Sequence, residues 1–316
     1  MSSLNICPVA QLPRQPEAAR WLVEELWSEQ AVGIVGGEPK CCKSFLALEL
    51  ALAVASGMPC LGRFTVPHPG GVLLFAAEDA LHVVRERAEA IANRRGLDLE
   101  AITLDVITTP IVRLDRDTDR RALLEAVDKL RPRLLVLDPF VRLHRIDENV
   151  ASEVAPLLAF LRELQRSFHT AVLLVHHARK GAAHSRAGQA LRGSSELHAW
   201  GDSNLYMRRS TETLQLTIEH RAAAAGPARP LKLVVDNDSI ALELLEPAAA
   251  EAPMTHTATP EQRVKTILAE ARSPVSLSQL RQACKIRMKT LCSTLACLTS
   301  QGAIVKSPAG HHMPAT

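Results

Sequence analysis

A run of small, polar and basic residues follows a short apolar segment at residues 31–35. It reads Gly37-Glu38-Pro39-Lys40-Cys41-Cys42-Lys43-Ser44, which fits the pattern G-x-x-x-x-G-K-[ST] except that Cys42 replaces the second glycine. In that pattern, backbone N–H groups and a helix N-terminus face phosphate oxygens, the lysine reaches the β and γ phosphates, and the hydroxyl binds Mg²⁺. A coincidental loop is the alternative. The apolar segment before the run and the helical pattern after it favour a phosphate site.

Acidic residues end two other apolar segments. Asp138 follows residues 134–137, and Glu78 and Asp79 follow residues 72–77. Parallel strands end at a common edge of their sheet, so these carboxylates can converge on the phosphate loop. Asp138 is then placed beside the Mg²⁺ shell, with a helix-capping aspartate as the alternative. Glu78 is placed to polarise an attacking water, whereas Asp79 is expected to cap the next helix.

A histidine pair ends a further apolar segment at residues 171–175. His176 and His177 come directly after it. A polar side chain at this edge can sense a γ-phosphate, and a histidine bonded to the backbone is the alternative. A metal bound by both is disfavoured, because adjacent strand residues point to opposite faces of a sheet.

Apolar segments alternate with amphipathic, helix-length segments over the front of the chain. Strands are expected at residues 31–35, 71–77, 103–107, 134–137 and 171–175, and helices at about 16–30 and at 43–56, 80–95, 118–130 and 151–168. This alternation predicts an α/β fold with a mostly parallel sheet covered on both faces. Strand patterns without helices follow at residues 203–208, 213–219, 230–235 and 239–244, and predict antiparallel strands along one edge.

The remainder of the chain divides from this front part by composition and by charge. Residues 246–259 carry no hydrophobic period and predict a linker between a domain at 1–245 and a domain at 260–316. The last 57 residues hold eight basic and two acidic residues, a net charge of +6, whereas the rest of the chain carries −3. A basic module is therefore joined to a mildly acidic body.

The basic module shows three helical patterns, at residues 261–271, 276–284 and 287–300, and then a short hairpin. This order predicts a winged helix-turn-helix domain. The bases expected to contact duplex DNA are Lys285, Arg287, Lys289 and Lys306. A winged helix that binds protein, with its basic residues merely solvated, is the alternative.

The ordered motifs resemble the RecA-like ATPases of the RepA-type hexameric replicative helicase family. The resemblance covers residues 15–245 or so and rests on GGEPKCCKS, GVLLFAAED, RLLVLDPF, LLVHHARKG, LRGSSELHAWGD and LTIEHRAAAAG. It implies an ATP- and Mg²⁺-binding core that assembles as a homo-oligomeric ring, such as a hexamer, with nucleotide between subunits.

The resemblance also implies roles for single residues. Lys43 and Ser44 match the phosphate-loop pair, Glu78 the catalytic glutamate, and Asp138 the Walker B acid. His177 lies near the sensor position. Arg221 matches the arginine finger, which reaches the site of the next subunit, although an exposed turn arginine is the interpretation without the family.

A polar, basic segment spans residues 178–195. In RecA-like rings a loop at this place faces the central channel, so Lys180 and Arg186 are expected to track single-stranded DNA. A solvated lid over the nucleotide is an equally good account of the segment.

Cys42 is the main departure from the family pattern. A side chain at this position can crowd the β-phosphate, so nucleotide binding is a safer expectation than fast hydrolysis. Cys41 and Cys42 lie at a helix N-terminus beside Lys43, where thiols of low pKa are expected and oxidation could switch the site off. Tolerance of cysteine as a small residue is the alternative.

The sequence predicts a cytoplasmic protein, because it shows no signal peptide or membrane span and has an odd number of cysteines, seven, without zinc-like spacing. The expected function is that of a ring ATPase acting on DNA in replication or mobile-element maintenance, helicase-like in its motifs. One alternative is a nucleotide-gated DNA-binding regulator with little hydrolysis because of Cys42. Another is an assembly factor that recruits replication proteins.

Overall fold

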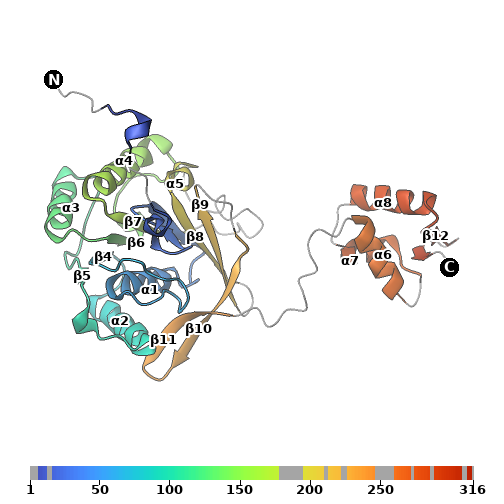
Figure 1. Cartoon of the computed structure of the whole chain (residues 1–316), viewed down its shortest axis with the longest axis horizontal. Helices are drawn as coiled ribbons and strands as arrows, with labels where there is room; N and C mark the ends of the chain where they lie inside the picture. The colour runs from blue at the N-terminus through green and yellow to red at the C-terminus, as the bar shows by residue number, and fades with distance from the viewer. Residues whose placement is uncertain are drawn as a thin grey trace. The chain divides into compact units, whose positions relative to one another are not determined.

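The computed structural model describes residues 6–12, 16–177, 195–209, 213–221, 226–245, 260–271, 274–284, 288–307 and 312–314. The chain forms two compact units, Met1–Glu246 and Pro247–Thr316 (Figure 1). Residues 246–259, where a linker is predicted, lie outside the described residues. Over the described part of the chain, every helix is too short or too polar to cross a membrane.

A nine-stranded sheet forms the centre of the first unit, in the order β11-β10-β9-β8-β3-β7-β6-β4-β5. Its strands are β3 (Val32–Gly37), β4 (Val72–Ala76), β5 (Leu104–Val106), β6 (Leu134–Asp138), β7 (Ala171–His177), β8 (Ser203–Arg209), β9 (Leu214–His220), β10 (Arg229–Asp236) and β11 (Ser239–Leu244). The strands from β8 to β5 pair in parallel, and those from β8 to β11 pair antiparallel. The predicted fold class, a mostly parallel sheet with antiparallel edge strands, is confirmed.

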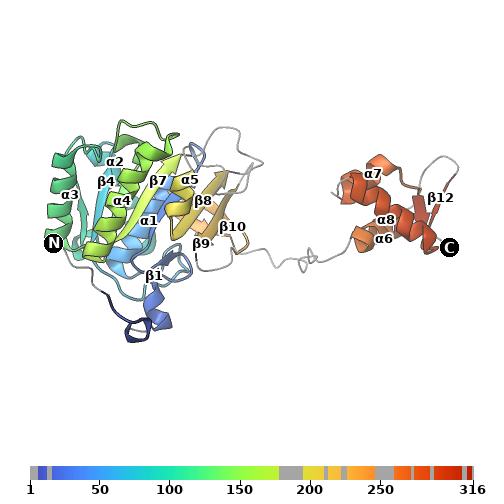
Figure 2. The same cartoon turned by 90° about the horizontal axis from the view of Figure 1, so that it is seen from above.

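Helices cover both faces of this sheet (Figure 2). The helices are α1 (Lys43–Ser56), α2 (Leu81–Arg95), α3 (Asp117–Leu130), α4 (Ala151–Phe168) and the short α5 (Ser195–Trp200), with 3-10 turns at Val9–Gln11, Glu17–Arg20, Leu99–Ala101 and Phe140–Arg142. Successive residues of β6 alternate between two cores: Val136 packs on the α1 and α2 side, and Leu137 on the α3 and α4 side. This period of two is the pattern of a strand buried on both faces.

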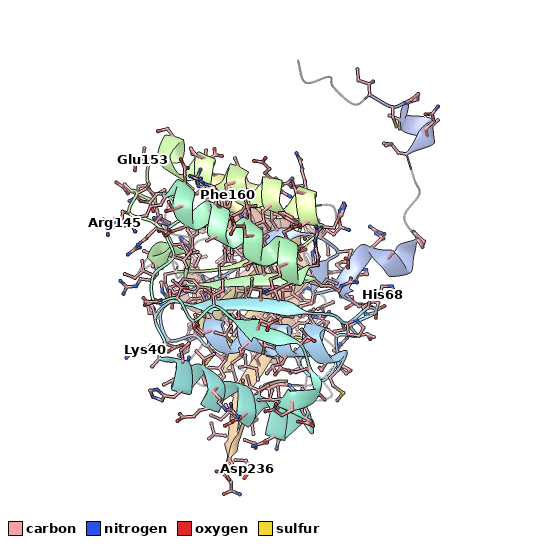
Figure 3. The ribbon with its side chains drawn as sticks, turned by 90° about the vertical axis from the view of Figure 1, so that its left-hand side faces the viewer. Lys40, His68, Arg145, Glu153, Phe160 and Asp236 are labelled. Atoms are coloured by element: carbon pink, nitrogen blue, oxygen red, sulfur yellow. The ribbon has the colours of Figure 1, made fainter. Side chains whose placement is uncertain are left out.

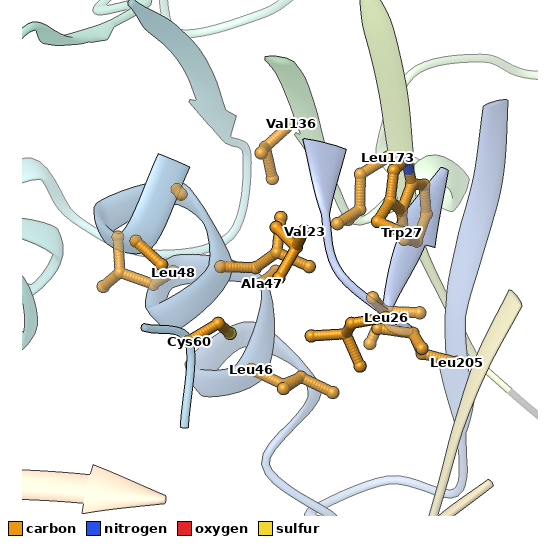
Figure 4. Close-up of a cluster of buried hydrophobic side chains, with 14 of the residues drawn as sticks. Val23, Leu26, Trp27, Leu46, Ala47, Leu48, Cys60, Val136, Leu173 and Leu205 are labelled. Atoms are coloured by element: carbon orange, nitrogen blue, oxygen red, sulfur yellow. The ribbon is translucent and has the colours of Figure 1, made fainter. Parts of the chain in front are cut away.

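The N-terminal helix predicted at about residues 16–30 is wrong. Only the 3-10 turn Glu17–Arg20 is helical, and a hairpin of β1 (Trp21–Val23) and β2 (Trp27–Ser28) follows. The backbone takes positive φ values at Glu25, 57°, and at Gln30, 52°, which a continuous helix does not allow. Leu22, Val23, Leu26 and Trp27 are fully buried in this segment. Figure 4 shows three of them packed among side chains of α1 and of the sheet, so burial against the core outweighs local helix propensity.

β3 approaches β8 so closely that two positions of β3 hold glycine. A Cβ atom at Gly33 would lie 1.6 Å from the carbonyl oxygen of Ser203, and one at Gly37 would lie 2.1 Å from that of Met207. No side chain fits at such distances without moving the backbone of β8. The two glycines therefore let β3, the strand that leads into the phosphate loop, pair tightly with the parallel strand β8.

The second unit has a core of its own. It contains α6 (Pro260–Glu270), α7 (Leu277–Cys284), α8 (Met288–Ser300) and an antiparallel pair of β12 (Ile304–Lys306) and β13 (His312–Pro314). The Ser276 hydroxyl accepts from the Gln279 N–H, and the Gln279 amide oxygen accepts from the Ser276 N–H, so α7 begins with a reciprocal capping box. The buried core residues of the second unit are Val264, Leu268, Leu280, Cys284, Leu291, Leu295, Leu298 and Ile304.

Candidate nucleotide site

A cleft of about 270 Å³ opens at the carboxyl ends of the parallel strands of the first unit. Its lining residues are Lys40, Cys41, Cys42, Lys43, Ser44, Phe45, Glu78, Asp79, Arg87, Asp138 and His177. Figure 3 shows Lys40 and Arg145 at one edge of the layered body and His68 at the other. The cleft thus brings together residues from the phosphate loop and from the ends of β4, β6 and β7, as the strand-end motifs predict.

The phosphate loop holds two non-glycine residues in the left-handed backbone region. Lys40 has φ 63°, and Cys42 has φ 63° and ψ 29° where it caps the N-terminus of α1. Glycine adopts this conformation without strain, whereas in other residues it raises the conformational free energy by about 1–2 kcal/mol. Cys42 therefore occupies a backbone position that suits the glycine of the usual pattern.

Lys43 is buried, and its ammonium is satisfied by the loop itself. Its Nζ donates to the Glu38 carbonyl oxygen at 2.7 Å and lies 3.8 Å from the Cys41 sulfur. A buried ammonium requires such partners. The side chain therefore already lies over the loop, where a phosphate oxygen could compete for its protons.

Asp138 and Ser44 both line the cleft and are hydrogen-bonded to each other, so they offer two oxygen atoms as ligands for a metal ion. Burial is the largest cause that raises the pKa of Asp138 to about 6, and the charges of Asp79 and Glu78 raise it further, while the Ser44 hydroxyl and Lys43 oppose the shift. Mg²⁺ prefers hard oxygen ligands and usually takes only one or two from protein, keeping waters and phosphate oxygens for the rest. A buried carboxylate bonded to a hydroxyl fits such an ion.

Glu78 and Asp79 are each paired with an arginine. Glu78 Oε1 lies 2.8 Å from Arg142 Nε in an exposed ion pair. Asp79 pairs with Arg87 of α2. The prediction that Asp79 caps α2 is wrong, because Ala80 is the N-cap residue and the helix start has no side-chain cap. The Asp79 carboxylate is engaged by the Arg87 guanidinium instead, and both side chains line the cleft.

The two histidines of β7 point to opposite faces, as their adjacency requires. His177 lines the cleft, whereas His176 is buried on the other side, with its Nε2 3.2 Å from Glu148 Oε2. The same carboxylate lies 3.2 Å from Nε2 of His144. Of the pair, His177 is thus the one placed among the phosphate-loop residues, and its role as a sensor stays a prediction.

The prediction of low-pKa thiols in the phosphate loop is wrong. Burial raises the pKa of both Cys41 and Cys42, and it outweighs the nearby positive charges of Lys43 at Cys41 and of Arg209 at Cys42. Desolvation disfavours a thiolate even at a helix N-terminus. Neither thiol is therefore activated for oxidation by its surroundings.

Arg221 is not brought to the cleft of its own chain. Arg221 comes directly after β9. Its Nη1 lies 3.2 Å from Asp202 Oδ1, and its Nη2 donates to the Trp200 carbonyl oxygen at 3.2 Å. Other predicted contact residues fall outside the described residues, namely Lys180, Arg186, Lys285 and Arg287. Lys289 and Lys306 lie in α8 and β12, but their side chains are not described.

Three arginines at this site were not predicted from the sequence to contact it. Arg87 lies over the Phe45 ring, 5.3 Å from its centroid, and pairs with Asp79. Arg142 pairs with Glu78, and Arg209 donates to the Lys40 carbonyl oxygen. Arg142 and Arg209 come from elements distant in sequence from their partners, so only the packing of the elements could reveal them.

The raised pKa of Asp138 predicts a pH-dependent stability for the ligand-free protein. Because its pKa is higher in the folded chain, about 6, than in the unfolded chain, its contribution to stability is present at low pH and is lost as pH rises through 6. Relative to Asp138→Asn, the parent should lose about 2 kcal/mol between pH 4.5 and pH 8. Urea unfolding at several pH values measures this difference, with Asp105→Asn, an exposed strand carboxylate, as control. A parent-minus-variant difference that stays constant with pH contradicts the expectation.

Comparisons with known proteins agree with the fold described above. The AAA_25 family model, described as an AAA domain, matches residues 3–183. One solved ATPase domain superposes with a TM-score of 0.53 at 12% identity, covering 67% of this chain and 84% of that one. A DnaB-like replicative helicase, solved in a study of its interactions with primase, gives 0.50 at 12% identity over 67% and 57% of the two chains. The expected RecA-like core is confirmed, and the chain belongs to the AAA_25 family of AAA domains.

Proposed function

We propose that this protein is an ATPase that acts on DNA, with a RecA-like core that assembles into a ring and serves replication or the maintenance of a mobile element. The observation that supports it best is the convergence of Lys43, Ser44, Glu78, Asp138 and His177 on one cleft. A phosphate-binding lysine, a pair of Mg²⁺ ligands, a second carboxylate and a polar strand-end residue are the parts that phosphoryl transfer to water needs.

Each part has a definite task in this proposal. Lys43 and the loop N–H groups bind the phosphates, while Ser44 and Asp138 would hold Mg²⁺, whose charge would offset that of the phosphate oxygens. After its carboxylate turns from Arg142, Glu78 orients a water and accepts its proton, as the water oxygen bonds to the γ-phosphorus and the bond from that phosphorus to the ADP oxygen breaks. His177 contacts the γ-phosphate from the end of β7.

A nucleotide-gated regulator with slow hydrolysis is the second candidate. Two observations favour it: the strained backbone at Cys42 and the ion pair that holds Glu78 on Arg142. In this case the protein binds ATP tightly and uses it as a signal. The rate of hydrolysis separates the two candidates, since both need an intact phosphate loop.

We predict ATP hydrolysis by the full chain with Mg²⁺, measured as phosphate release with and without single-stranded DNA. Glu78→Gln should lower turnover by about 10²-fold or more while ATP still binds, because only the transition state uses the base. Lys43→Ala should lose binding itself, and Glu86→Gln, an exposed glutamate of α2, should match the parent. Absence of turnover with retained binding in the parent favours the regulator, and equal ATP binding by Lys43→Ala contradicts both candidates.

We predict that the second unit contacts duplex DNA through Lys289 and Lys306. In the full chain, Lys289→Ala with Lys306→Ala should weaken binding and reduce the slope of log K against log salt by about one per lysine. Lys265→Ala with Arg281→Ala removes the same charge from exposed positions of α6 and α7 and serves as control. Fluorescence anisotropy over a salt series measures the slope. If both double variants lose the same affinity for DNA, binding depends only on net charge. If the parent shows no salt-dependent binding to DNA, a protein-binding role for the unit is favoured.

We also propose that Arg221 acts on the site of a neighbouring subunit. If so, Lys43→Ala and Arg221→Ala are each inactive alone, but a mixture regains turnover, because a Lys43→Ala subunit offers its arginine to an intact loop. When the two variants assemble at random in equal amounts, about a quarter of the sites between subunits contain both an intact loop and an intact arginine. Turnover of the mixture, with light scattering on the same sample, tests this. A mixture no more active than its components contradicts action between subunits.

A further inference from the structure

An arginine from the neighbouring strand holds the phosphate loop from outside the cleft. Arg209 is the last residue of β8, whose Met207 pairs in register with Gly37 at the start of the loop. Its Nε and Nη2 donate to the carbonyl oxygen of Lys40 at 3.3 and 3.0 Å. The same guanidinium is hydrogen-bonded to the Cys42 side chain.

Both residues that Arg209 contacts lie in the left-handed backbone region without being glycine. Lys40 and Cys42 each have φ 63°. Such residues persist only where surrounding contacts hold them, because each is strained by about 1–2 kcal/mol. A loop with glycine at the second position would need less external support.

The bond to Lys40 also determines how its peptide group is oriented. A trans peptide is planar and its C=O and N–H point in opposite directions. Since the Lys40 carbonyl points to Arg209, the N–H of Cys41 points away from it. Lys40 and Cys41 line the cleft, whereas Arg209 does not, so Arg209 acts on the loop from outside its nucleotide-facing surface.

We propose that Arg209 is a positioning residue that holds the phosphate loop in its anion-binding conformation and compensates for the cysteine at position 42. It acts through the backbone of its own chain and does not need to touch the nucleotide. The inference rests on the proposed function, since the loop is taken to bind nucleoside triphosphate.

Equilibrium titration of the full chain with ATP and Mg²⁺ tests the inference. Arg209→Ala should weaken binding about tenfold, and Arg209→Lys should weaken it nearly as much, because a lysine keeps the charge but loses the forked donors. Arg208→Ala, which removes the same charge from the adjacent exposed position, should bind as the parent does. In the Cys42→Gly background, Arg209→Ala should weaken binding less than about threefold, because the loop then supports itself.

Several results would overturn the inference. Equal weakening by Arg208→Ala indicates a general charge effect, full rescue by Arg209→Lys indicates direct attraction of the phosphates, and equal losses in the two backgrounds show that Arg209 and Cys42 are not coupled. If the parent binds no ATP, the proposed function fails instead.

A measurement without nucleotide then decides the loop's dependence on Arg209. Cys42→Gly should raise Tm more in the Arg209→Ala background than in the parent, because the strained loop has lost its external support. Equal increments in the two backgrounds overturn the inference independently of any binding.

Discussion

The close pairing of β3 with β8 is the constraint on which the site depends. Carbonyl oxygens of β8 occupy the space that side chains at Gly33 and Gly37 would fill, so a side chain at either position would displace the backbone of β8. The phosphate loop begins where this contact ends. The pairing therefore determines which elements surround the loop: β8 on one side, and on the other β7, which pairs with β3 in parallel.

Charge is concentrated around the cleft in a way that folding alone does not favour. Asp138 and Lys43 are buried, and Glu78 and Asp79 add like charge near Asp138. Arginines from other elements offset this charge, Arg142 at Glu78 and Arg87 at Asp79. A site of this kind costs stability without its ligand and regains it when a cation and phosphates complete the set of charges. The core elsewhere is formed mainly by aliphatic side chains on both faces of the sheet, together with a few aromatic ones such as Trp27, Phe75 and Phe140.

Local pattern predicted much of the fold and the composition of the cleft. Short apolar segments bounded by turn residues mark the buried strands, and because parallel strands share an edge, residues such as Glu78 and Asp138 could be placed together. The arginines could not, since Arg209 and Lys40 are 169 positions apart and only strand order makes them neighbours. The same limit explains the errors. Burial cannot be derived from a local sequence pattern. It favours a hairpin at residues 21–28, and it raises the pKa values of Cys41 and Cys42.

Asp202 has a consequence for how a ring could form. Its carboxylate pairs with Arg221 and also with Arg162 of α4, and it accepts from the N–H of Val32. If Arg221 swings out to another subunit, Asp202 keeps two partners and is not left as a buried, unpaired charge. The departure then breaks a half-exposed ion pair, which contributes about 0–1 kcal/mol, and the exposed hydrogen bonds from Arg221 to the Ala199 and Trp200 carbonyl oxygens. Because these interactions are exposed, water can replace them when Arg221 leaves. Its release would therefore add only a small free-energy cost to the association of subunits.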